Sequence, residues 1–198
     1  MSRGGEEAKE LVDLGGAVVE RARAAGADVA EASVHSGSHL SIKVRMREPE
    51  LVEEAGSRAL GLRVMVGKRV ASTYTSDLSE AGQRLLIEDA MELAKLSEDD
   101  EFAGPPDASE LSNASQWADL DTFDDTVSGI AADEAMSRAL EGEKAAFDYD
   151  ARITNSEGAT FTRARGVSAL VTSGGFAGGD VGTYASVVVT PVADDDGG

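Results

Sequence analysis

The sequence predicts an α+β fold: an antiparallel β-meander packed with three main helices and followed by glycine-rich β-hairpins. The first observation is that stretches with apolar residues at helical spacing are separate from stretches in which apolar and polar residues alternate. The second is composition, because 41% apolar but only 5% aromatic residues predict a core of Ala, Val, Leu and Ile. A chain of 198 residues is long enough for one sizeable core or two small ones.

Two helices are predicted in the first half of the chain. Residues 5–25 carry Leu, Val and Ala at helical spacing, and this helix should stop at Gly26. The second helix is capped by Asp77 or Ser79, and its apolar stripe ends near Leu96. Each helix therefore has an apolar face that is suited to packing on a sheet.

Four strands are predicted between these helices. Residues 30–47 alternate between apolar and polar side chains, which is typical of a long strand with one buried and one solvated face, bent or bulged at Gly37. Residues 51–57, 58–67 and 68–76 follow as three shorter strands. We expect these four strands to form the antiparallel meander.

The second half begins with an acidic, irregular segment. Residues 97–125 contain paired prolines, many acids and many hydroxyl groups, so we expect a long excursion without regular structure. Thr126 then caps a third helix that runs to about Phe147, and the remainder is β-rich with glycines between the strands. The sequence thus divides into residues 1–96, 97–125 and 126–198.

The net charge of −19, with 37 Asp and Glu against 18 Lys and Arg, is the most extreme property of the composition. It argues against binding to nucleic acid, whose phosphates would approach a surface of the same sign. Self-repulsion of this size weakens a compact state at low ionic strength, and salt screens it. We therefore predict an acidic, halophilic protein from a salt-loving source.

The chain has no cysteine, which excludes disulfides, thiolate zinc sites and cysteine nucleophiles. No segment approaches the ~18 consecutive apolar residues that a membrane span needs. The N-terminus also lacks the apolar region of a signal peptide. We expect a cytoplasmic protein that binds neither membrane nor nucleic acid.

Three patterns suggest chemistry, but none satisfies the requirements of a catalytic or metal centre. His35 and His39 are four residues apart, yet they lie in a predicted strand and neither has a neighbouring Glu. The stretch Ser173–Gly179 lacks the Lys and the helix that follow a phosphate cradle, and it favours a tight β-turn. A Ser-His-Asp triad has no support, because no spacing brings a histidine to Ser156. We expect no catalytic residue and no metal ligand in this chain.

Residues 153–166, ITNSEGATFTRARG, place an amide, a hydroxyl and a carboxylate side by side at Asn155, Ser156 and Glu157. Together with Gly158, these residue types favour a polar turn between two strands. We expect this turn to shape a hairpin that faces substrate or partner, and to take no part in a chemical step.

Six phrases of the sequence carry a resemblance to a known family: GADVAEASV, RALGLRVMVGKRVASTYTSDLS, SEDDEFAGPP, LDTFDD, ITNSEGATFTRARG and SGGFAGGDVGTYASVVV. In this order they resemble the N-terminal half of the TldD/PmbA family, whose members were once labelled modulators of DNA gyrase and are better described as cytosolic metalloproteases. The resemblance covers almost the whole chain. Its details are closer to the PmbA (TldE) branch than to the TldD branch.

The resemblance implies a subunit that is not catalytic by itself. In the family, a TldD-type subunit carries a zinc-binding H-E-x-x-x-H helix and forms a heterodimer with a PmbA-type subunit that lacks this motif. The motif is absent here, which has two explanations: a PmbA-like branch, or a chain that stops before the region in which the motif stands. The branch-specific phrases favour the first explanation, so the resemblance places zinc only in a TldD-like partner. The implied substrates are unfolded or extended peptides. A typical member continues into a C-terminal β-rich domain, so we expect this chain to be a fragment or a shortened paralogue.

An alternative from another functional class stays open. The chain is then a stand-alone peptide- or protein-binding domain that keeps the fold without the proteolytic assembly. An independent hydrolase that uses the two histidines is a third hypothesis, and it predicts zinc in the isolated chain.

Overall fold

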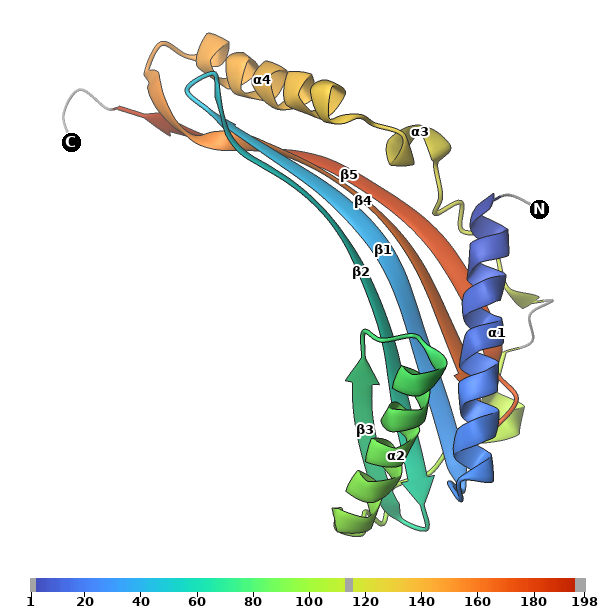
Figure 1. Cartoon of the computed structure of the whole chain (residues 1–198). Helices are drawn as coiled ribbons and strands as arrows, with labels where there is room; N and C mark the ends of the chain where they lie inside the picture. The colour runs from blue at the N-terminus through green and yellow to red at the C-terminus, as the bar shows by residue number, and fades with distance from the viewer. Residues whose placement is uncertain (1–2, 113–115, 195–198) are drawn as a thin grey trace. The chain divides into compact units, whose positions relative to one another are not determined.

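The computed structural model describes residues 3–112 and 116–194, and in these residues five strands form one antiparallel sheet in the order β3-β2-β1-β4-β5 (Figure 1). The predicted α+β class is confirmed, with α1, α2 and α4 as the three main helices. Within the described residues, no helix combines the length and the apolar character that a membrane span requires. The elements are α1 (Arg3–Ala24), β1 (Val29–Arg45), β2 (Glu48–Val66), β3 (Arg69–Thr75), α2 (Glu80–Leu96), the 3-10 turn η1 (Ala108–Glu110), α3 (Asp125–Ser128), α4 (Ala132–Tyr149), β4 (Ile153–Thr172) and β5 (Ala177–Ala193).

Packing divides the chain into two compact units. The first unit consists of Met1–Ser36, Ser57–Asp121 and Gly166–Val181, and the second of Gly37–Gly56, Thr122–Arg165 and Gly182–Gly198. The four long strands β1, β2, β4 and β5 each contribute one part to each unit.

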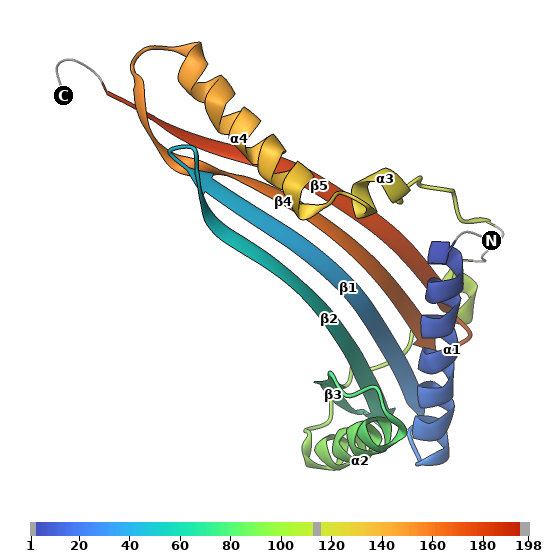
Figure 2. The same cartoon turned by 45° about the horizontal axis from the view of Figure 1, so that its top comes forward.

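The core of the first unit lies between one face of the sheet and the helices α1 and α2. Helix α2 lies along β3 (Figure 2), and its N-cap Ser79 accepts a hydrogen bond from the backbone N–H of Gly82, as the sequence predicts. Fully burying a Val or Leu side chain stabilises a fold by about 1.5–3 kcal/mol. The buried residues include Val18, Ala22, Ala30, Ala32, Val34, Leu60, Leu62, Val64, Leu86, Ile87 and Ala90.

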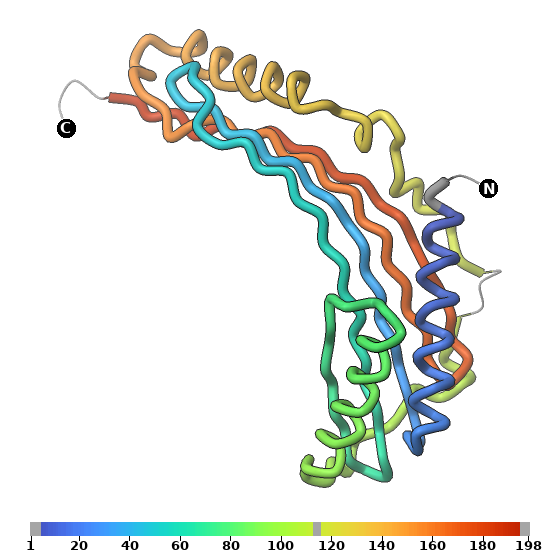
Figure 3. Tube along the Cα trace, viewed as in Figure 1, coloured from blue at the N-terminus to red at the C-terminus, as the bar shows by residue number. Residues whose placement is uncertain are grey.

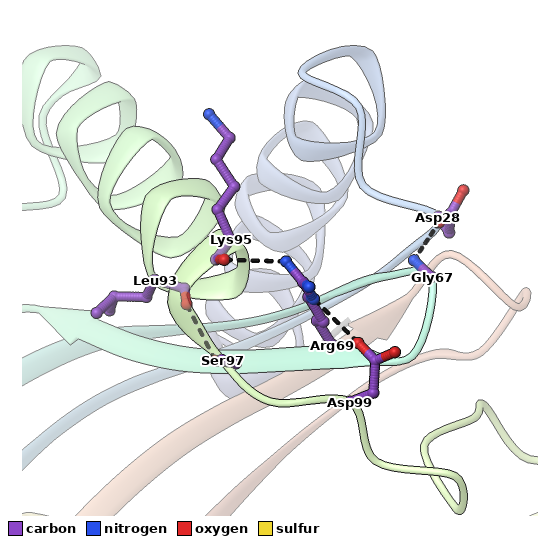
Figure 4. A network of polar contacts seen from close by, with 7 residues as sticks. All are labelled: Asp28, Gly67, Arg69, Leu93, Lys95, Ser97 and Asp99. Atoms are coloured by element: carbon purple, nitrogen blue, oxygen red, sulfur yellow. Dashed lines mark hydrogen bonds and ion pairs between the residues drawn. The ribbon is translucent and has the colours of Figure 1, made fainter.

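Arg69 joins the end of α2 to the start of β3 in this unit (Figure 4). Its Nη1 donates to the carbonyl oxygen of Lys95 at 3.0 Å, and its Nε donates to Oδ1 of Asp99 at 3.0 Å. The last carbonyls of a helix have no partner within the helix, so the guanidinium satisfies one of them. At the nearby β2–β3 turn, Asp28 Oδ2 accepts the backbone N–H of Gly67 at 2.7 Å.

Trp117 attaches the irregular segment after α2 to the first unit. Its ring centroid lies 5.5 Å from that of Phe176, and its Nε1 donates to Ser112 Oγ at 2.8 Å. A Cβ atom on Gly178 would lie 2.6 Å from the indole ring. Only glycine therefore allows the indole to approach this strand so closely.

The core of the second unit lies between α4 and its sheet. Val187 and Val189 of β5 lie against α4 at Gly142, where an added Cβ atom would be 3.0 and 3.2 Å from their side chains. The buried residues of this core are Leu40, Ile42, Val44, Ile130, Ala135, Ala139, Ala159 and Phe161.

The predicted number of strands in the meander, four, is wrong. Residues 51–57 and 58–67 were expected to be separate strands, but both belong to the single strand β2, so the meander consists of β1, β2 and β3. The physical reason lies at Gly56, where the backbone stays extended. Glycine permits a turn but does not impose one.

The third predicted helix is interrupted. Asp124 caps the short α3 through the N–H of Thr126, and the helix resumes only at Ala132 as α4. Between them Ile130 is buried, and its carbonyl oxygen accepts a hydrogen bond from Arg163 Nε at 2.7 Å. The chain leaves the helical path here because the second core takes up the Ile130 side chain.

Candidate functional site around the β4 bulge

The predicted turn at Asn155–Gly158 is wrong, because all four residues lie within the continuous strand β4 of the second unit. Ser156 and Gly158 are buried, and then Ala159 and Phe161 are buried, so the alternation of the strand shifts by one residue. Gly158 has a φ of +117°. A shifted alternation beside a glycine with positive φ is typical of a β-bulge.

Hydrogen bonds within β4 and from β1 hold the bulge in place. Ser156 Oγ accepts the N–H of Gly158 at 2.8 Å, and Asn155 Oδ1 accepts the N–H of Ser156 at 2.8 Å. Arg45 Nε, from the end of β1, donates to the carbonyl oxygen of Ser156 at 3.0 Å. A Cβ atom on Gly158 would lie 2.6 Å from the carbonyl oxygen of Val44. The hydroxyl of Ser156 therefore has a structural role, and the glycine is required by the close approach of β1.

Glu143 of α4 is the second notable group of this unit, and sequence reasoning missed it. It is fully buried, and its two carboxylate oxygens accept the N–H groups of Met46 at 3.0 Å and Arg47 at 2.7 Å. These residues have φ values of 52° and 67°, which is the conformation of a two-residue hairpin turn. Met46 lies within residues 30–47, which were expected to form one strand, but it belongs to this turn and is 49% exposed.

A signal for Glu143 is present in the sequence. Ala135 and Ala139 are buried on α4, and Glu143 follows them at the same four-residue spacing. A carboxylate in the apolar stripe of a helix indicates a buried acceptor that needs partners. The hairpin turn itself has no such signal, because Met46 and Arg47 are not the Asn-Gly or Asp-Gly pair that favours this turn.

The bulge, the β1–β2 turn (Figure 3) and the end of α4 thus form one polar cluster. Arg47 also lies over the ring of Phe147 at 5.9 Å. On the neighbouring part of β1, Lys43 Nζ contacts Glu50 Oε2 at 2.5 Å, and this hydrogen bond lowers the pKa of the exposed Glu50 carboxyl. The cluster holds backbone segments in fixed positions. It contains no pair of a nucleophile and a base.

The two histidines do not form a site. His35 belongs to the first unit and His39 to the second, where its Nε2 lies 3.4 Å from Glu53 Oε1. Among residues 3–112 and 116–194, no three His, Asp or Glu side chains are grouped so that they would hold a metal ion. The donor groups described here therefore do not fit a zinc centre. The predicted tight turn within Ser173–Gly179 is confirmed as the connection between β4 and β5.

A shallow hollow of about 240 Å³ lies on the sheet of the first unit. Its lining includes Glu31, Ser33, Gly61, Arg63 and Leu170. Arg63 Nη1 and Glu31 Oε2 are 2.9 Å apart and neutralise each other, so this hollow offers little attraction to a charged ligand.

Comparison with known proteins gives two family matches and several relatives. Residues 30–94 match the PmbA/TldA metallopeptidase domain 1, and residues 125–198 match the PmbA/TldA metallopeptidase central domain. The Metalloprotease PmbA homolog of Haemophilus influenzae is 37% identical over 157 residues, which are 79% of this chain and 34% of the relative. Metalloprotease PmbA of Escherichia coli O157:H7 is 32% identical over 170 residues, 86% of this chain and 37% of the relative. The chain thus spans about a third of the length of the curated relatives it matches.

Solved structures share the fold at lower identity. A protein from Bacteroides thetaiotaomicron, described as a candidate modulator of DNA gyrase, has a TM-score of 0.78 at 20% identity, over 93% of this chain and 41% of its own. TldE from Thermococcus kodakarensis has a TM-score of 0.78 at 15% identity, over 92% of this chain and 40% of its own. The family matches, the curated relatives and the shared fold agree with one another. The chain belongs to the TldD/PmbA family, and its residues correspond to the first and central domains of that family.

Proposed function

We propose that the chain is a non-catalytic, PmbA-like subunit, or part of one, of a cytosolic peptidase whose zinc lies in a TldD-like partner. The observation that carries this proposal is the identity of 37% and 32% to proteins named Metalloprotease PmbA. In this proposal the assembly degrades unfolded or extended peptides, and this chain contributes strand surfaces.

The gyrase label of some relatives is not transferred to this chain as DNA binding. A net charge of −19 opposes the approach of a polyanion. Peptides are the more suitable ligands, because an exposed strand binds them through backbone hydrogen bonds that do not depend on charge.

Co-expression tests the proposal. The tagged chain is produced together with a TldD-like zinc subunit from the same organism, and cleavage of a labelled extended peptide is measured. We expect a complex that contains zinc, and cleavage only when both chains are present. A TldD-like subunit in which the first His of its zinc motif is replaced by Ala should still bind the chain but should not cleave. A chain that neither co-purifies with the zinc subunit nor changes its cleavage rate refutes the proposal.

A second candidate is the stand-alone peptide- or protein-binding domain, and the outer strand β5 favours it, because residues 181–193 of this strand carry no charge. It predicts that the isolated chain binds extended peptides and recruits no zinc subunit. The same co-purification therefore separates the two candidates.

A further inference from the structure

The second unit has two outer strands that differ sharply in charge. β5 is the last strand of the sheet and pairs only with β4, as the red and orange tubes in Figure 3 show. β2 is the outer strand on the opposite side of this unit, because β3 pairs only with Leu60–Val66. Outer strands carry unpaired N–H and C=O groups to which other chains can add, and natural proteins protect them with charges and proline.

The β2 edge is protected by both charges and proline, whereas the β5 edge has a proline only near its end, at Pro191, and no charge along its second half. Within nine residues, Glu48–Gly56 contain a proline and four glutamates. In β5, by contrast, no charged residue occurs between Asp180 and Asp194, in a chain of which 28% is charged. Tyr184 and Val188, four residues apart and therefore on one face of the strand, are each 59% exposed. A long uncharged edge in so acidic a protein requires an explanation.

Two hydrogen bonds show which amides of β5 point outward. The N–H of Thr183 donates to the carbonyl oxygen of Thr122, which lies outside the sheet, at 2.9 Å. The N–H of Asp194 donates to the carbonyl oxygen of Arg152, directly before β4, at 2.9 Å. Since the direction alternates along a strand, odd-numbered residues of β5 direct their backbone groups away from β4.

The outward groups therefore belong to Ala185, Val187 and Val189. No strand of the described residues lies on this side of β5. Pro191 also has an odd number, which agrees with the rule that proline in a sheet faces an open edge. The contact at Thr122 shows that the outward N–H of Thr183, at the beginning of this edge, already binds a backbone carbonyl of another segment.

We propose that the outer edge of β5, from Ala185 to Val189, binds an extended peptide as an added strand. The peptide should be uncharged over its pairing residues and basic at its ends, because the pairing edge carries no charge while the chain as a whole carries −19. A second copy of this chain is a poorer occupant, since two chains of this charge repel each other. The inference rests on the proposed function only in choosing peptides as the ligand.

Proline substitution tests the edge directly. The probe is a fluorescently labelled peptide of alternating Val and Thr with a Lys at each end, and its binding to the full chain is measured by anisotropy without a zinc subunit. Ala185→Pro removes one outward N–H and leaves the ladder to β4 intact, so we expect about tenfold weaker binding. Ala185→Val keeps the N–H and should bind as the unaltered chain does.

A second arm needs no variant of the protein. The same peptide with an N-methyl group on every pairing residue loses the donors of both edges and should not bind. The amides of Ala185, Val187 and Val189 should exchange hydrogen more slowly when the unmethylated peptide is bound.

Equal binding by the Ala185→Pro variant and the unaltered chain, or full binding of the methylated peptide, overturns the proposal. So does a chain that dimerises through this edge and binds no peptide, as sedimentation would show. Because this assay measures binding by the isolated chain, its failure is distinct from failure to form an active complex.

Discussion

Glu143 is a fully buried carboxylate whose partners are two backbone N–H groups of another element. Burying a charged group is costly unless hydrogen bonds compensate it, and bonds to a charged acceptor are stronger than those between neutral groups. Here the two partners are the residues that give the β1–β2 turn its unusual backbone conformation. One side chain of α4 thus stabilises a turn whose own residues, Met46 and Arg47, do not favour it.

Glu143→Gln should lower the free energy of unfolding by about 1–3 kcal/mol, because the amide nitrogen would face one of the two N–H donors. Urea unfolding followed by circular dichroism measures this change. Glu141→Gln is the matched control, since Glu141 is exposed on the same helix and loses the same charge. Equal effects of the two substitutions would contradict the role of Glu143.

At the scale of elements, β4 is longer than its sequence suggests because it contains a bulge where a turn was predicted. Gly158 has positive φ, as a turn would require, but its neighbours remain extended and the strand continues to Thr172. Positive φ at one residue serves a bulge as well as a turn. The sequence supplies a glycine, which permits positive φ in either structure. Pairing of β4 with β1 then decides that the backbone forms a bulge and not a turn.

Gly158→Ala should destabilise the protein by about 2 kcal/mol or more, since alanine is strained at this φ and its Cβ would approach the carbonyl oxygen of Val44. Gly16→Ala in α1 is the control, because nothing lies within 4 Å of its added Cβ. The control should remain within about 1 kcal/mol of the parent and tend toward higher stability. Thermal unfolding measures both, and a tolerated Gly158→Ala would argue against the bulge.

The expected and the observed elements together show which features local sequence patterns predict. Helices α1 and α2 are predicted nearly to the residue, because their apolar spacing and the cap at Ser79 are local signals. The break at Ile130 and the burial of Glu143 depend on contacts with β4 and with the β1–β2 turn. Such contacts join residues that are distant in the chain, and local patterns do not contain them. The expected turn at Asn155–Gly158 is therefore a bulge within a strand, and its expected role toward substrate or partner stays a prediction.

At the scale of the whole molecule, the net charge of −19 should make stability depend on salt. Screening shortens the range of repulsion from about 30 Å at 0.01 M to about 3 Å at 1 M ionic strength. We expect the melting temperature to rise continuously from low to molar KCl. NaCl at equal ionic strength is the control, because screening does not distinguish the two cations. A melting temperature that does not change with KCl would remove the prediction of a halophilic protein.

Trp117 is the only tryptophan of the chain, and it lies against Phe176 at the attachment point of the irregular segment. Its ultraviolet emission therefore reports the surroundings of one place in the first unit. A spectral change on heating reports the loss of the contact between Trp117 and Phe176. Circular dichroism recorded in parallel separates local release of the acidic segment from unfolding of the first unit. The intrinsic fluorescence of Trp117 is thus a probe of the irregular segment that needs no added dye.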